Sequence, residues 1–109
     1  MSRPRIGSLR YRLTLEAPER VATEGGAADL TWTPIASVFA RILPRGGREQ
    51  FASHALAADV THDITFRYRS GVRPQMRLTD GARVFEILAV IDVAERRRWI
   101  TCQCREDLR

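Results

Sequence analysis

Lysine is absent from the sequence, and cysteines, aromatic residues and long apolar runs are scarce. All 18 basic residues are arginine, so the net charge of +5 rests on guanidinium groups. Arginine suits bidentate contacts with carboxylates and phosphates, and the acidic residues interleaved with it disfavour a purely electrostatic nucleic-acid binder. No apolar run approaches the ~20 residues of a membrane helix, so no membrane partner is expected. The N-terminal stretch MSRPRIGSLRYR has no apolar core, which argues against a signal peptide and predicts an intracellular protein or one released by lysis.

The only cysteines are Cys102 and Cys104, in the stretch TCQC. On a strand, residues two apart point to the same face about 7 Å apart, which is too far for a comfortable disulfide. A zinc site would need two further ligands, and the sequence has no second cysteine pair. We therefore predict two small apolar residues that face a core.

An alternation of apolar and polar residues with a period of two predicts an all-β chain of one domain, residues 1–109. The stretch LRYRLTLE, Leu9–Glu16, is typical of a half-buried strand. Leu30–Leu43 is extended and apolar on both faces, and Pro34 indicates a bulge or an edge position. Asp80 and Gly81 predict a type I′ turn between two further strands. With strands in HDITFRYR and WITCQC, the fold class is a small six-stranded β-barrel or compact sandwich.

Only one segment has a helical pattern. In REQFASHALAA, residues 48–58, Phe51, Ala55 and Ala58 recur at helical spacing, and no residue is β-branched. Such a short helix is marginal in water, so it must dock or stay mobile. The sequence thus predicts a long projecting loop with one short helix, residues 44–59, between strands 2 and 3; loops of this length are usually functional or disordered.

A metal or catalytic site near this loop is not supported. His54 and His62 are eight positions apart, whereas paired metal ligands on a helix need a spacing of three or four. His62 and Asp63 are neighbours at the start of a strand, so their side chains diverge, and we expect a solvated polar loop end. There is no nucleophile elbow and no glycine-rich phosphate loop. We predict no metal, no catalytic residue, no cofactor and no enzymatic activity.

Nucleic-acid binding is the alternative function. A small barrel with exposed arginines and aromatic residues is compatible with an OB-like or Sm-like nucleic-acid binder. The other interpretation of the same arginines is a solvated or protein-binding sheet face with a charged hairpin tip that blocks edge-to-edge aggregation. The candidate residues are Arg10, Arg12, Arg67, Arg69, Arg96, Arg97 and Arg98.

The order of the motifs resembles the phage head–tail joining proteins, the head-completion or stopper proteins of long-tailed phages and related gene-transfer particles. The resemblance rests on IGSLRYRLTLEAP, LTWTPIASVFARI, PRGGREQF and the block from THDITFRYRSGV to WITCQCRE, and it covers nearly the whole chain. It implies a virion protein at the head–tail interface, assembled in the bacterial cytoplasm, that forms a homo-oligomeric ring of six or twelve subunits. The portal and head–tail adaptor would lie above the ring, the tail terminator or tail tube below it, and packaged double-stranded DNA in its channel.

The resemblance also implies a channel or gating role for the long loop. In the family this loop projects toward the channel and helps to retain the genome. Its candidate residues here are Arg45, Gly46, Gly47, Arg48, Glu49, Gln50, Phe51, His54 and Leu56. We expect a subunit or partner interface at Arg10, Arg12, Trp32, Arg41, Arg67, Arg69, Arg96, Arg97 and Arg98.

Overall fold

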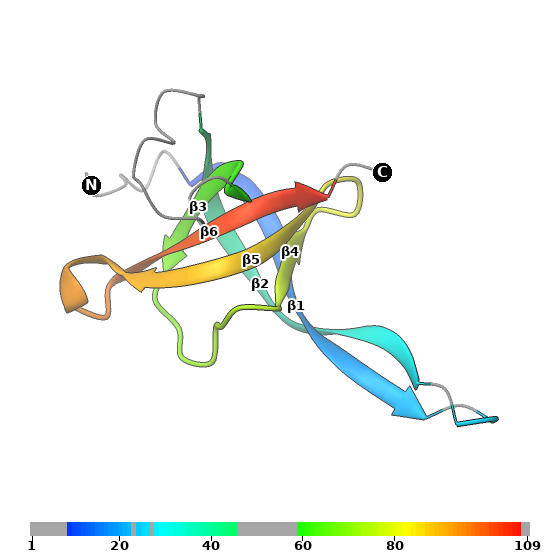
Figure 1. Ribbon diagram of the computed structural model, residues 1–109. Helices are drawn as coiled ribbons and strands as arrows, with labels where there is room; N and C mark the ends of the chain where they lie inside the picture. The colour runs from blue at the N-terminus through cyan, green and yellow to red at the C-terminus, as the bar shows by residue number, and fades with distance from the viewer. Residues whose placement is uncertain (1–8, 23, 27, 46–58, 108–109) are drawn as a thin grey trace.

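The computed structural model describes residues 9–22, 24–26, 28–45 and 59–107. Six strands and one short 3₁₀ turn make up the regular structure of these residues (Figure 1). Their bounds are β1 (Tyr11–Ala22), β2 (Ala28–Pro44), β3 (His62–Arg67), β4 (Arg77–Thr79), β5 (Val84–Asp92), the 3₁₀ turn η3 (Val93–Glu95) and β6 (Trp99–Asp107).

The strands close into a barrel in the order β1-β2-β3-β6-β5-β4, and every neighbouring pair is antiparallel. The closure is completed by a short pairing of β1 with β4, from Thr14 opposite Thr79 to Glu16 opposite Arg77. A closed barrel leaves few open strand edges, which is one way in which small antiparallel domains avoid edge-to-edge association. The predicted all-β six-stranded fold is confirmed, and of the two predicted architectures the structure has the barrel.

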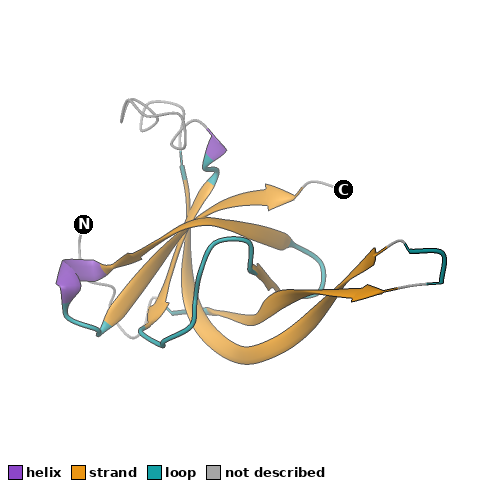
Figure 2. Cartoon of the chain, turned by 60° about the horizontal axis from the view of Figure 1, so that its bottom comes forward, coloured by secondary structure: helices purple, strands orange, loops and turns teal. Residues whose placement is uncertain are grey.

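A two-stranded arm extends from the barrel, formed by β1 from Glu16 to Ala22 and β2 from Ala28 to Pro34 (Figures 1 and 2). Beyond Glu16, which still pairs with Arg77 on β4, its strands pair only with each other, and Gly25 and Gly26 turn the chain at its tip with φ values of 91° and 84°. The arm begins at a β-bulge, because Leu15 lies opposite Ala36 whereas Glu16 lies opposite Pro34. Of the two alternatives expected at Pro34, a bulge or an edge position, the structure shows a bulge beside it, with Ile35 as the extra residue, and this bulge bends the hairpin out of the barrel wall.

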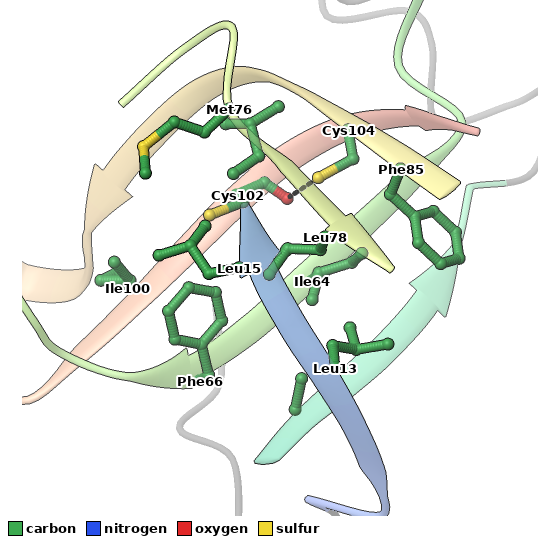
Figure 3. Close-up of a cluster of buried hydrophobic side chains, with 12 residues drawn as sticks. Leu13, Leu15, Ile64, Phe66, Met76, Leu78, Phe85, Ile100, Cys102 and Cys104 are labelled. Atoms are coloured by element: carbon green, nitrogen blue, oxygen red, sulfur yellow. Dashed lines mark hydrogen bonds between the residues drawn. The ribbon is translucent and has the colours of Figure 1, made fainter. Parts of the chain in front are cut away.

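The barrel interior is filled by the residues that the alternation placed on one face of each strand. Phe66 and Phe85 are the largest fully buried side chains, and Cys102 and Cys104 pack beside them, as predicted (Figure 3). Burial raises the pKa of Cys102 to about 12 and raises the pKa of Cys104 as well, so both thiols are inert in the folded protein. The remaining core residues are Leu13, Leu15, Ala40, Ile64, Met76, Leu78, Ile87 and Ile100.

The hairpin between β4 and β5 is confirmed, but its predicted type I′ turn is wrong. The last cross-strand pair is Thr79 with Val84, so residues 80–83 form a longer connection. Only Gly81 in it has a positive φ, of 97°, whereas a type I′ turn needs two such residues. The Asp80 carboxylate instead accepts hydrogen bonds from the backbone N–H groups of Ala82 (2.9 Å) and Arg83 (2.7 Å). These bonds lower the pKa of Asp80 and hold the wider turn.

The connection between β2 and β3 runs from Arg45 to Thr61, in agreement with the predicted long loop. Its two ends are joined, because the Arg45 backbone N–H donates to the Thr61 carbonyl oxygen at 2.9 Å. Val60 is completely buried at the same place. The predicted helix at 48–58, with candidate residues from Gly46 to Leu56, lies outside the described residues.

Candidate functional site

Four arginines and an exposed phenylalanine form the most distinctive surface of the described structure. Phe39 points outward from β2 and is 60% exposed. Arg12 lies opposite it on β1, and Arg67 and Arg69 line a cavity of about 440 Å³ together with it. Arg41 follows two residues after Phe39 and so belongs to the same outer face of the barrel. We call Arg12, Phe39, Arg41, Arg67 and Arg69 the arginine surface.

None of these arginines contacts a carboxylate among the described residues. Arg12 donates to the Ser37 hydroxyl at 2.9 Å, and the Arg67 guanidinium lies 5.2 Å from the centre of the Trp99 ring. The Nε atoms of Arg41 and Arg69 are buried and have no hydrogen-bond partner within the described part of the chain. Buried donors are normally paired, so this surface has the unsatisfied polarity and excess charge of a binding surface.

The predicted interface residues fall into three groups. Arg12, Arg41, Arg67 and Arg69 come together as above, and Arg10 is exposed just before β1. The exposed residues Arg96–Arg98 form the turn before β6, which lies next to the cavity because the Tyr68 N–H donates to the Arg98 carbonyl oxygen at 3.0 Å. Trp32 is separate: it lies on the arm, where the Arg77 guanidinium stacks over its ring at 4.1 Å.

The opposite side of the barrel neutralises its own charges. Arg77 on β4 contacts Glu16 on β1 at 2.6 Å, and Arg105 on β6 contacts Glu86 on β5 at the same distance. These side chains alternate in sign across four neighbouring strands, β1-β4-β5-β6. The acids on this side thus pair within the chain, and no carboxylate among the described residues contacts the arginine surface.

A cluster at the foot of the β2–β3 loop was missed by sequence reasoning. The Arg83 guanidinium donates hydrogen bonds to both carboxylate oxygens of Glu106, at 2.8 and 3.1 Å, and lies 4.7 Å from the centre of the Phe85 ring. His62 packs edge-on against Phe85 and is 12% exposed. The expectation of a solvated polar loop end is therefore wrong: β3 carries His62 into the wall opposite β6, where it is largely covered.

The hydrogen bonds of His62 identify its neutral form. The Arg83 guanidinium can only donate, so Nε2 of His62, 3.3 Å from it, is the acceptor. Nδ1 then carries the proton and donates to the Thr61 hydroxyl at 2.8 Å. Glu106 lies 3.9 Å from Nε2, but its carboxylate is already bound by Arg83. Burial, with Arg83 adding to it, lowers the pKa of His62 against the opposing effect of Glu106 and Asp63.

This environment predicts a loss of stability in mild acid. The unfolded chain takes up a proton at His62 near pH 6.5, above the folded pKa, so the free energy of unfolding decreases as the pH falls below that value. In His62→Gln this pH dependence is expected to flatten between pH 7.5 and 5.5. Urea unfolding at a series of pH values, with NMR titration of the His62 ring, measures both effects. A His62 pKa at or above 6.5 would contradict this explanation.

A second contact joins the loop to the barrel on the face of β3 opposite to His62. The Arg45 side chain contacts Asp63 at 3.0 Å, with both side chains largely buried. His62 and Asp63 do diverge to opposite faces, as expected, since one packs on Phe85 and the other contacts Arg45. Of the candidate channel residues in the loop, the structure therefore describes only Arg45, whose side chain ties the start of the loop to β3.

No metal site or membrane helix is found in the described part of the chain. Residues 9–22, 24–26, 28–45 and 59–107 contain no group of three or more histidine, cysteine, aspartate or glutamate side chains able to hold a metal ion. Within the same ranges, no helix has the length and apolar character needed to cross a membrane.

Comparison with known proteins assigns a family. The model of the phage head completion protein family matches residues 4–107. Among solved structures, a solution structure of a Shigella flexneri 2a protein is similar with a TM-score of 0.72 and 28% identity, over 93% of this chain and 95% of that one. A chain in the virion of a native gene transfer agent particle is similar with a TM-score of 0.70 and 29% identity, over 97% and 98%. No curated protein matches. The chain belongs to the phage head completion protein family.

Proposed function

We propose that this protein is a non-catalytic virion component that forms a stopper ring in the head–tail connector of a phage or gene-transfer particle. The match to the head completion family over residues 4–107 carries the proposal, and the similarity to a chain of a gene transfer agent virion supports it. The ring joins the portal and adaptor to the tail and helps to retain packaged DNA. An uncompensated arginine surface suits this role, since a subunit between two partners needs faces whose charges are matched only in the assembly.

Deletion of the gene in the producing strain tests the proposal. Without the stopper, we expect filled heads without tails, or heads that have lost their DNA, and at least a tenfold loss of DNA-delivering particles. Electron microscopy and nuclease-resistant DNA measure the two defects, and expression of the chain in trans should restore both. Tailed, DNA-filled particles at the yield of the parent strain would refute the role.

The arginine surface also supports the alternative of a nucleic-acid-binding barrel. Guanidinium groups without carboxylate partners around the exposed Phe39 ring match the needs of phosphates and bases. This function requires DNA binding by the isolated chain that weakens steeply with salt, because each phosphate contact releases counterions. Fluorescence anisotropy with short duplex and single-stranded DNA measures it. Absence of binding at low salt would dismiss the alternative and leave the connector role intact.

A further inference from the structure

The arm and the arginine surface lie toward opposite ends of the molecule. In both views the arm extends from one end of the barrel, and the η3 turn that leads to Arg96–Arg98 lies at the other (Figures 1 and 2). The long dimension of the molecule is 50 Å, against 29 and 27 Å across. Beyond Glu16 the strands of the arm pair only with each other, so its exposed residues are available to a partner.

The two faces of the arm differ in their surroundings. One carries Arg20, Leu30 and Trp32; it faces the barrel across a groove of about 620 Å³ that Gln75 and Glu86 also line. The other face carries Glu19 and Val21 on β1 and Asp29 on β2, because the cross-strand pairs alternate between the two faces of the arm. We call this second face, Glu19, Val21 and Asp29, the acidic face.

The acidic face is exposed and makes no ion pair with a described residue. Its three residues are all exposed, Val21 to 45%. The Glu19 carboxylate accepts a hydrogen bond from the Thr33 hydroxyl at 3.0 Å, and its backbone carbonyl accepts one from the Thr31 hydroxyl at 3.2 Å. No cation among the described residues contacts Glu19 or Asp29. Prolines at positions 18 and 34 remove backbone N–H donors from both arm strands, which disfavours the addition of a further strand at either edge. A partner would therefore meet the arm through a face.

The arginine surface is the complement of this face within the same chain. Four carboxylates elsewhere, Glu16, Asp63, Glu86 and Glu106, are already held by arginines. Within the described part of the chain, Glu19 and Asp29 of the arm thus have no cation partner, and the arginines of the arginine surface have no carboxylate partner. The cavity at the arginine surface is lined by apolar side chains, Leu9 and Phe39, as well as by Arg67 and Arg69, so it can accept an apolar residue flanked by acids.

We infer that the acidic face of one copy docks onto the arginine surface of the next copy. In this contact Val21 enters the cavity beside Phe39, and Glu19 and Asp29 pair with Arg67 and Arg69. Charge-assisted contacts of this kind set orientation and partner choice. Because the two surfaces differ and lie at opposite ends, the contact repeats head to tail, and it closes into a ring when the rotation per subunit allows. The inference rests on the proposed function, which requires assembly, and adds the contact that produces it.

Cysteine cross-linking in purified particles tests the contact directly. The variant Val21→Cys/Phe39→Cys should form a ladder of covalent multimers on oxidation, since each copy then offers one thiol to each neighbour. Either single variant should stay monomeric, because a head-to-tail contact never brings two copies of the same position together. The buried native thiols do not contribute. Dimers from a single variant, or particles that contain the double variant but form no ladder, would overturn the inference.

Charge reversal gives an independent readout if cysteines disturb assembly. Glu19→Arg/Asp29→Arg and Arg67→Glu/Arg69→Glu are each expected to lower incorporation of the chain into particles at least tenfold, and their combination in one chain should restore it. The matched controls are Arg20→Glu, on the other face of the arm, and Arg73→Glu, in an exposed loop; both should be incorporated normally.

The outcomes separate this inference from the proposed function. Normal incorporation of either reversal variant, or no recovery in the combination while all variants fold, would refute the contact. The proposed function fails by a different observation: parental particles that do not contain the chain, or deletion particles that are complete. Circular dichroism of each purified variant checks that the barrel is folded; the substituted residues are all exposed except Arg69, which is half-buried at the arginine surface.

Discussion

Removal of residues 48–58 is expected to leave the barrel folded while particles lose most of their DNA. The ends of the loop are fixed independently of its middle, by the backbone bond between Arg45 and Thr61 and by the contact between Arg45 and Asp63. After the deletion, positions 46, 47, 59 and 60 would span the hydrogen-bonded residues Arg45 and Thr61, and a connection of four residues is common in antiparallel hairpins. The fold should therefore tolerate the deletion, and its effect should appear in the particle.

The measurement is the fraction of nuclease-resistant DNA in purified particles, together with thermal unfolding of the isolated chain. A variant in which residues 48–58 are replaced by a Gly/Ser linker of equal length separates the role of the side chains from that of loop length. Normal DNA retention in both variants would exclude a gating role for the loop. Failure of the isolated deletion variant to unfold cooperatively would instead show that the loop supports the barrel.

Truncation of Phe66 is expected to destabilise the barrel by about 3–5 kcal/mol, the usual cost of replacing a buried phenylalanine with alanine. Phe66 is fully buried, and its neighbours across the sheet are Ala40 on β2 and Ile100 on β6. Ala40 is too small to fill the space, so the cavity would persist. A domain of this size has a total stability of about 5–15 kcal/mol, so the loss is a large part of the whole.

Phe39→Ala is the matched control, because it removes the same side chain from a strand of the same barrel at an outward position. With Phe39 60% exposed, its truncation should change stability by only about 0.5 kcal/mol or less. Urea unfolding of the isolated chains measures both midpoints. Similar losses in the two variants would contradict the inward and outward assignment of these side chains. Incorporation into particles should show the opposite order, with the larger loss for Phe39→Ala, because Phe39 belongs to the proposed contact between copies.

The barrel and its interior were predictable because strand formation and burial obey a local rule. Successive side chains of a strand point to opposite faces, so Leu13 and Leu15, or Cys102 and Cys104, identify the inward face without any knowledge of their neighbours. Pro34 signalled the bulge for an equally local reason, since proline cannot donate to a ladder. The β4–β5 turn was the local exception, because the Asp80 carboxylate stabilised a wider connection than the Asp-Gly signal predicts.

Charge pairing was not predictable in the same way. Arg77 and Glu16 are distant in the sequence, as are Arg83 and Glu106, and they meet only because strand order and register place them side by side. The same holds for His62, whose burial depends on Phe85 and Arg83 from another hairpin. A sequence with arginines and acids interleaved is compatible with many pairings, and the pairing that forms decides which side chains remain available for a partner.

The sequence by itself therefore determined an all-β fold, either a barrel or a compact sandwich, with a bulge or an edge position at Pro34 and a long loop after the second strand, because each of these follows from a local pattern of side chains. Only the tertiary structure decided that, among the residues it describes, no carboxylate contacts Arg12, Arg41, Arg67 or Arg69 and no cation contacts Glu19 or Asp29. The physical reason is that an ion pair depends on a distance of a few ångströms between residues from different strands. Closure of the barrel sets that distance, and spacing along the chain does not.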